Sequence, residues 1–130
     1  MDKQLSKKHF SLLARRKSFT YAFRGLGILF KTQENSWIQI FFAGLIIFLG
    51  ISLRISTIEW LMIIFSIGLV LTAEAFNTAI EIDIDLTSPT YHPYARNTKD
   101  VAAGAVLLAS FTAAAIGLII FLPKLLLLHF

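Results

Sequence analysis

Four polar side chains in the middle of the sequence share one face of a predicted helix: Glu74, Asn77, Glu81 and Asp85. Their spacing of three, four and four residues places them within roughly 80° of one another on a helix. The neighbouring acid, Asp83, falls on the opposite side and is expected to be solvated. A carboxylate on such a stripe can act as a general base or as a ligand of a hard cation such as Mg²⁺.

Glu74 needs a particular explanation because it follows a mostly apolar run that begins at Ile58. About 20 residues cross the hydrocarbon core of a bilayer, so Glu74 is expected just inside the cytosolic boundary, with Glu81 at or beyond it. A carboxylate costs about 2.5–3.5 kcal/mol at the centre of a span and less near its edge. A hydrogen bond that holds a helical bundle together is the structural alternative. Asn77 and Glu81 on the same face favour a functional site.

A second polar cluster, Asn97-Thr98-Lys99-Asp100, precedes the last apolar run. Asn97 is placed like an N-cap and Asp100 like the acid of a capping box, so capping explains both as well as function does. Lys99 in a first helical turn would oppose the helix dipole, and it suits an anion such as phosphate. Carboxylates and a lysine at one membrane face favour phosphoryl transfer, although the glycine-rich motif G-x-x-x-x-G-K-[ST] is absent.

The elements that must position these groups are helices in a membrane. Of the 130 residues, 56% are hydrophobic and 15% are charged, whereas about a quarter of the residues in a soluble domain are charged. The length predicts one domain, and the absence of cysteine excludes disulfides and thiolate metal sites. The ranges predicted to span the bilayer are 36–54, 58–86 with a cytosolic extension, and 98–122, where Pro123 ends the helix.

Residues 1–35 hold eight of the twelve basic residues and are predicted to form an amphipathic helix. Its apolar face consists of five residues: Leu12, Phe19, Phe23, Leu26 and Phe30. A basic helix with such a face is typical of a helix that lies in the membrane interface. Docking on a soluble body is the alternative, but little soluble protein remains. The net charge of +4 therefore indicates an anionic lipid surface as the partner, and no nucleic acid.

The distribution of lysine and arginine predicts the orientation in the cell membrane. The segment 1–35 and the connection 86–100 are basic, whereas the other side has only Arg54 and Lys124. The positive-inside rule therefore predicts a multi-pass protein with a cytosolic N-terminus. Small residues that let helices approach closely recur every four residues in the third span: Ala105, Ala109, Ala113 and Gly117.

Two longer motifs carry a family resemblance: E-A-F-N-T-A-I-E at 74–81 and K-D-V-A-A-G-A-V-L at 99–107, with Asp85 and Tyr91-His92 between them. They resemble the small prokaryotic integral-membrane diacylglycerol kinases, a family that includes undecaprenol kinases. The resemblance extends from Lys17 to Pro123. It implies an ATP- and Mg²⁺-dependent kinase that converts diacylglycerol to phosphatidic acid, or undecaprenol to undecaprenyl phosphate. It also implies a homotrimer with active sites between subunits.

The resemblance also implies roles for individual residues. Glu74 matches the catalytic base, Asn77 a residue that orients groups near it, and Glu81 a metal ligand. Five further residues match positions at or near the nucleotide: Lys99, Asp100, Asp85, His92 and Tyr21. The K-D-V-A-A-G-A motif is closer to the version in undecaprenol kinases than to the serine-containing version of many diacylglycerol kinases.

The sequence departs from the family pattern shortly before the first span. The family has a metal-binding glutamate two residues before an asparagine, but Gln33 stands at that spacing from Asn35. Either Glu34, the adjacent residue, serves as the metal ligand after a shift of one helical position, or metal binding is altered. Gln39 stands where relatives often have histidine or glutamate.

Two alternatives to a kinase use the same acidic stripe. One is an oligomer that conducts cations through a ring of Glu74 and Glu81 side chains, and the other is a non-catalytic assembly protein. A conducting protein needs polar groups near the bilayer midplane or along a continuous path. Gln39 and Ser52 are the polar side chains of the first apolar run, so the sequence provides no such path.

Overall fold

The chain is entirely helical in the part that the structure describes. A computed structural model describes residues 12–32 and 34–127. It contains four helices: α1 (Leu12–Thr32), α2 (Glu34–Ser52), α3 (Thr57–Thr87) and α4 (Pro93–Leu127). Of these, α2, α3 and α4 are long and apolar enough to cross a membrane. The prediction of an all-helical protein with three candidate membrane spans is therefore confirmed.

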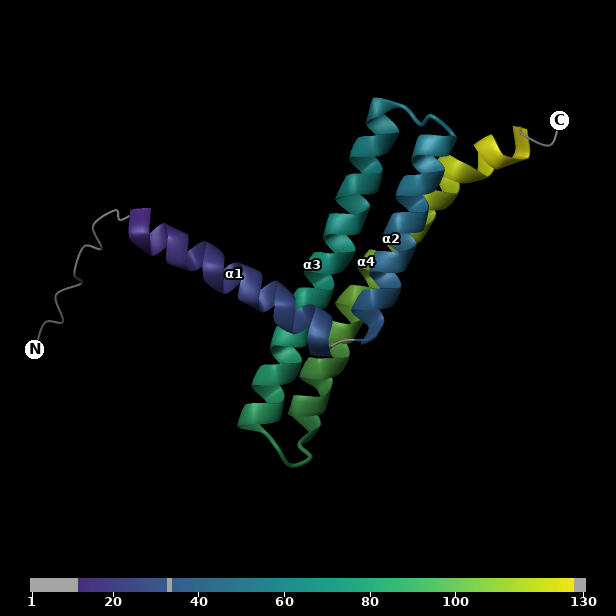
Figure 1. The fold of residues 1–130 in the computed structure, drawn as a ribbon. Helices are drawn as coiled ribbons and strands as arrows, with labels where there is room; N and C mark the ends of the chain where they lie inside the picture. The colour runs from purple at the N-terminus through teal and green to yellow at the C-terminus, as the bar shows by residue number, and fades with distance from the viewer. Residues whose placement is uncertain (1–11, 33, 128–130) are drawn as a thin grey trace, which may run out of the picture.

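The helices α3 and α4 form an antiparallel hairpin that is the body of the fold (Figure 1). The 31 residues of α3 make a helix of about 46 Å, at about 1.5 Å per residue. A hydrocarbon core is only about 30 Å thick, so part of the hairpin must extend beyond it. The shorter α2 lies along the end of the hairpin that is remote from the α3–α4 turn (Figure 1). The first turns of α2 therefore lie beside the middle of α3.

The contact face of α4 differs from the predicted stripe of small residues. Ala102 and Ala109 are buried, and Ile120 and Phe121 are buried farther along the helix. Of the predicted stripe, Ala109 is thus buried and Ala113 and Gly117 are half-buried, whereas Ala105 is exposed. The seven-residue step from Ala102 to Ala109 is typical of helices that cross at a small angle, where the contact repeats every 3.5 residues. Residues spaced strictly four apart shift gradually around the helix axis, so a stripe of this kind leaves the interface.

The turn between α2 and α3 is closely determined by hydrogen bonds. Arg54 adopts a left-handed backbone conformation with φ 48°, and the N–H of Ile55 donates to the carbonyl of Gly50 at 3.1 Å. These features form a Schellman motif at the end of α2. Ser56 then begins α3 with a capping box, in which its N–H donates to the Glu59 carboxylate at 2.7 Å. The path of the chain from one span to the next is therefore fixed.

The predicted end of the last helix at Pro123 is wrong. α4 continues through Pro123 to Leu127, and its last turns, yellow in Figure 1, bend away from the earlier axis. Proline removes one backbone donor and crowds the preceding turn, which kinks a helix without always ending it. The continued helix brings Lys124 to Glu59 of α3, with an N–O distance of 3.1 Å. This ion pair ties α4 to the start of α3.

Gly50→Ala is expected to destabilise the protein. A Cβ atom at this position would lie 2.8 Å from Cη2 of Trp60 and 3.0 Å from Cδ1 of Ile55. The packed side chains would have to move, at a cost of about 1–3 kcal/mol, and the thermal unfolding temperature in detergent micelles should fall. Gly44→Ala is the control, because no described atom lies within 4 Å of its added Cβ. Equal unfolding temperatures for the two variants would contradict this packing.

The helix α1 projects away from the hairpin (Figure 1). Leu29, near its end, is its one buried residue. Most of the predicted apolar face stays uncovered by the described residues, with Leu12, Phe19 and Phe23 all strongly exposed, whereas Phe30 is half-buried beside Trp37. The structure therefore does not support the alternative in which this face docks on the rest of the domain.

Candidate active site

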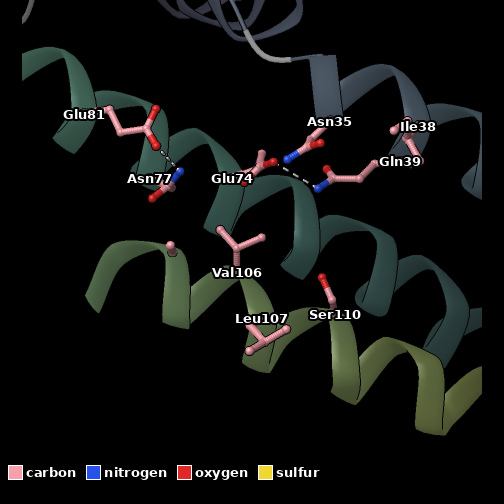
Figure 2. A pocket seen from close by; sticks show the side chains of 10 residues that line it. Asn35, Ile38, Gln39, Glu74, Asn77, Glu81, Val106, Leu107 and Ser110 are labelled. Atoms are coloured by element: carbon pink, nitrogen blue, oxygen red, sulfur yellow. Dashed lines mark hydrogen bonds between the residues drawn. The ribbon is translucent and has the colours of Figure 1, made fainter. Parts of the chain in front are cut away.

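A cavity of about 410 Å³ lies between α2, α3 and α4, beside the first turns of α2 (Figure 2). Its polar side chains come from all three helices: Asn35 and Gln39 from α2, Glu74, Asn77 and Glu81 from α3, and Ser110 from α4. The remaining lining from α4 is apolar. The predicted stripe on α3 thus lines one cavity from Glu74 to Glu81, because these residues recur at helical spacing.

Glu74 is the most deeply buried acid of the cavity, with 3% of its surface exposed. Its Oε1 accepts a hydrogen bond from Nε2 of Gln39 at 3.2 Å. Its backbone carbonyl accepts a second one from Oγ1 of Thr78 at 2.9 Å. A buried carboxylate is unfavourable unless donors compensate for lost water. The amide of Gln39 provides this compensation from a helix that is distant in sequence.

Asn77 and Glu81 form a second hydrogen-bonded pair in the same cavity. Nδ2 of Asn77 donates to Oε1 of Glu81 at 3.1 Å (Figure 2). Asn77 is only 8% exposed, and its Oδ1, like Oε1 of Gln39, is buried and accepts no hydrogen bond from the described residues. The amide oxygens of Asn77 and Gln39 are therefore buried polar atoms that the described residues leave without a hydrogen bond.

The oxygen donors of the cavity suit a hard cation such as Mg²⁺, which prefers carboxylates, carbonyl oxygens, water and phosphate. Glu81 and the amide oxygen of Asn77 are the donors that fit best. Among the described residues, no group of three or more histidine, cysteine, aspartate or glutamate side chains could hold a metal ion. A cation here would thus need phosphate oxygens or water to complete its ligands.

The residues predicted near the nucleotide do not line this cavity. Asp85, the last member of the stripe, pairs with Lys99 of α4 at 2.5 Å. Asp100 pairs with Arg96 one turn earlier on its own helix, at 3.6 Å. His92 in the turn and Tyr21 on α1 are exposed. The structure therefore brings together the predicted base and metal ligand on α3, but it does not bring these five residues to them.

The predicted capping role of Asn97 is wrong. α4 begins at Pro93, five residues before the predicted start of the span, and Nδ1 of His92 accepts a backbone N–H of the first turn at 3.3 Å. Proline suits the first position of a helix because its φ is preset and the missing donor is not needed there. Lys99 consequently lies in the second turn, and its pairing with Asp85 explains its charge without a helix N-terminus.

Glu34 begins α2, but its side chain and the whole of Gln33 lie outside the described part of the structure. The prediction that Glu34 is a metal ligand therefore stays untested. Asn35 and Ser110 were not predicted as cavity residues, and Gln39 was not predicted as a partner of Glu74. A usable signal was present for two of them, because Asn35 and Gln39 are four residues apart and so share a helix face.

Residues 20–121 match the profile of a family described as prokaryotic diacylglycerol kinase. This chain belongs to that family. An undecaprenol kinase of Bacillus subtilis is 40% identical over 109 residues, which cover 84% of this chain and 89% of that protein. A diacylglycerol kinase of Synechocystis is 39% identical over 110 residues, which cover 84% of this chain and 63% of that protein. The segment matched to the prokaryotic diacylglycerol kinase family includes the complete lining of the cavity.

Proposed function

We propose that this protein is a lipid kinase that transfers the γ-phosphoryl group of ATP to the hydroxyl group of diacylglycerol or undecaprenol. The observation that carries the proposal is the buried carboxylate of Glu74 in an open, oxygen-rich cavity beside the first turns of α2. A lipid hydroxyl is available at the membrane boundary, and a base must reach it there. The names of the two relatives, an undecaprenol kinase and a diacylglycerol kinase, support this substrate class.

In this proposal, Glu74 is the general base. It accepts the proton of the lipid hydroxyl while the hydroxyl oxygen forms a bond to the γ-phosphorus and the bond from that phosphorus to the leaving ADP oxygen breaks. Asn77, one turn away, orients the groups around the base. Burial of Glu74 keeps bulk water away from the transferred phosphoryl group, which would otherwise be lost to hydrolysis.

Glu81 and the amide oxygen of Asn77 would hold Mg²⁺, and Glu34 is the second candidate ligand. Bound Mg²⁺ neutralises phosphate charge during phosphoryl transfer. The hydrogen bond from Asn77 to Glu81 keeps the two side chains together on one face of α3. This leaves Glu74 for the proton and Glu81 for the metal, so the two acids that line the cavity have separate tasks.

Four residues near the α3–α4 turn, together with Tyr21 on α1, are proposed to bind the nucleotide: Lys99, Asp100, Asp85 and His92. Lys99 is paired with Asp85, and a bound nucleotide phosphate would replace this carboxylate at the ammonium group. The side chains of Asp100, His92 and Tyr21 do not line the cavity of their own protomer. This separation supports a homotrimer in which sites are shared between subunits.

The proposed orientation places the N-terminus, α1 and the α3–α4 turn on the cytosolic side. The uncovered apolar face of α1, opposite Lys17, Arg24 and Lys31, supports a position of this helix in the interface of the cell membrane. The basic connection 86–100 belongs to the same side. This arrangement gives ATP, which is cytosolic, access to the cavity.

The test is lipid phosphorylation by the purified protein in detergent micelles with Mg-ATP, with undecaprenol and diacylglycerol compared. We expect phosphorylated lipid, and faster turnover of undecaprenol, because the 99–105 motif and the relative with the longer coverage both point to that alcohol. Protein that is folded and phosphorylates neither alcohol would contradict the proposal.

The cation-conducting alternative finds no support in the described residues. Beyond Gln39 and Ser110 the cavity continues as a groove with an almost entirely apolar lining. Buried apolar side chains fill the far end of the bundle: Ile55, Ile63, Ile120 and Phe121. A cation would have no continuous row of polar ligands to follow across the hydrocarbon core.

A further inference from the structure

Gln39 lies beside Glu74 in the polar cavity (Figure 2). It also lines the apolar groove between α2, α3 and α4, so it lies where the two meet. Its two amide atoms have different surroundings. Nε2 donates to Oε1 of Glu74 at 3.2 Å, whereas Oε1 is buried and accepts no hydrogen bond from the described residues. An amide that is only half satisfied in an apolar span costs free energy. Packing alone would therefore favour an apolar residue at position 39.

The orientation of the Gln39 amide follows from its partner. The reverse orientation would place two acceptor oxygens, Oε1 of Gln39 and Oε1 of Glu74, against each other. Nε2 of Gln39 therefore donates to Glu74, and Oε1 of Gln39 is consequently left without a hydrogen bond from the described residues. The contact joins residues that are 35 positions apart in the sequence, so it also sets the height of α2 against α3.

The other polar side chains near Glu74 do not hold its carboxylate. The hydroxyl of Thr78 donates to the backbone carbonyl of Glu74, and the amide of Asn77 donates to Glu81. A glutamate side chain has three rotatable bonds, which its own helix does not fix. Among the described residues, Gln39 is thus the side chain whose hydrogen bond orients the Glu74 carboxylate.

We propose that Gln39 is a positioning residue that holds Oε1 of Glu74, so that Oε2 is the atom that takes the proton of the lipid hydroxyl. The inference rests on the proposed function of Glu74 as general base. In the step concerned, the O–H bond of the lipid breaks and its proton moves to Oε2. The lipid oxygen bonds to the γ-phosphorus of ATP, and ADP leaves with the electrons of the bond that breaks. Gln39 itself touches no reacting atom.

Gln39→Met tests this role, because methionine keeps the length and volume of the side chain and removes the donor. We expect kcat to fall about 10–100-fold, since small misplacement of a catalytic group has effects of that size. KM for ATP and KM for the lipid should stay within about twofold, because the variant leaves the binding residues in place. The lipid is whichever of undecaprenol and diacylglycerol the wild type phosphorylates. Ile40→Met, on an exposed neighbouring position, is the matched control.

Gln39→Glu provides a second test, the pH dependence of kcat, which would not change if Gln39 had only a packing role. A carboxyl group at position 39 donates to Glu74 only when it is protonated, because two carboxylates side by side repel each other. Among the side chains that the structure describes, the titratable ones that line the cavity are Glu74 and Glu81, both from α3, and α4 adds none. The kcat of Gln39→Glu relative to wild type should therefore rise as the pH falls, whereas the ratio for Gln39→Met should stay constant.

The outcomes separate this inference from the proposed function. An active wild type with an unchanged kcat in Gln39→Met would overturn the positioning role and leave the kinase intact. An effect confined to KM for the lipid would also overturn it, because Gln39 would then be a binding residue. If Gln39→Met does not fold, a pH-independent ratio for Gln39→Glu would overturn it. A wild type that phosphorylates neither lipid would overturn the function and this inference with it.

Discussion

Glu74→Gln is expected to lower lipid phosphorylation about 10²–10⁴-fold, the range that general bases contribute, while the protein stays folded and assembled. Glutamine keeps the shape of the side chain, and its amide oxygen can still accept the hydrogen bond that Nε2 of Gln39 gives to Oε1. It cannot take a proton from an alcohol. The loss should therefore lie in kcat, with little change in the binding of ATP or lipid.

The measurement is the rate of lipid phosphorylation in micelles, together with the unfolding temperature and the size of the assembled species. An intact assembly with no turnover separates catalysis from structure. If Glu74→Gln retained wild-type activity, the glutamate would be a structural hydrogen-bonding group, and the non-catalytic alternative would regain support. Loss of the assembly itself would point to the same conclusion.

Glu81→Gln is expected to have the second largest effect, a loss of at least about 10–100-fold with an increased requirement for Mg²⁺. The carboxylate of Glu81 lies one helical turn from Asn77, whose Nδ2 donates a hydrogen bond to it at 3.1 Å. A neutral amide at position 81 would bind a hard cation more weakly. A titration of activity against Mg²⁺ concentration should shift to higher concentration. A loss of activity with an unchanged Mg²⁺ midpoint would contradict the metal role.

Asp83→Asn is the control for both substitutions. Asp83 lies on the same helix, two residues from Glu81, but it is exposed and does not line the cavity. The activity of Asp83→Asn should stay within about twofold of wild type, as for most substitutions of exposed residues. A drop as large as that of Glu81→Gln would show that the residues of α3 act from a different face than the structure indicates.

The stripe on α3 could be predicted because helical periodicity depends only on local sequence. Glu74, Asn77 and Glu81 meet in the cavity as the spacing required. The start of α4 could not be predicted in the same way, since Asn97 and Asp100 imitate a capping box, whereas Pro93 and His92 form the actual helix start. Both segments have residues that favour a helix start, and α4 begins at the earlier one.

The partners that lie across helices could not be derived from the sequence. Lys99 pairs with Asp85 on another helix, and Gln39 donates to Glu74 on another helix, and local spacing predicts neither partner. Such pairs depend on the rotation and height of one helix against another. These quantities are set by packing over the whole bundle, such as the cluster around Ile63, and not by any short motif.

The turn between α2 and α3 places an unusual limit on changes of chain length. Loops commonly accept added or deleted residues, but this turn joins a Schellman motif directly to a capping box. One extra residue would either break those hydrogen bonds or pass into α3 as a rotation of about 100° and a rise of about 1.5 Å. Glu74 would then turn away from Gln39, which lies about 20 Å along α2 from the turn. One residue inserted in the α2–α3 turn, far from the cavity, should thus reduce activity as much as a substitution in the cavity itself.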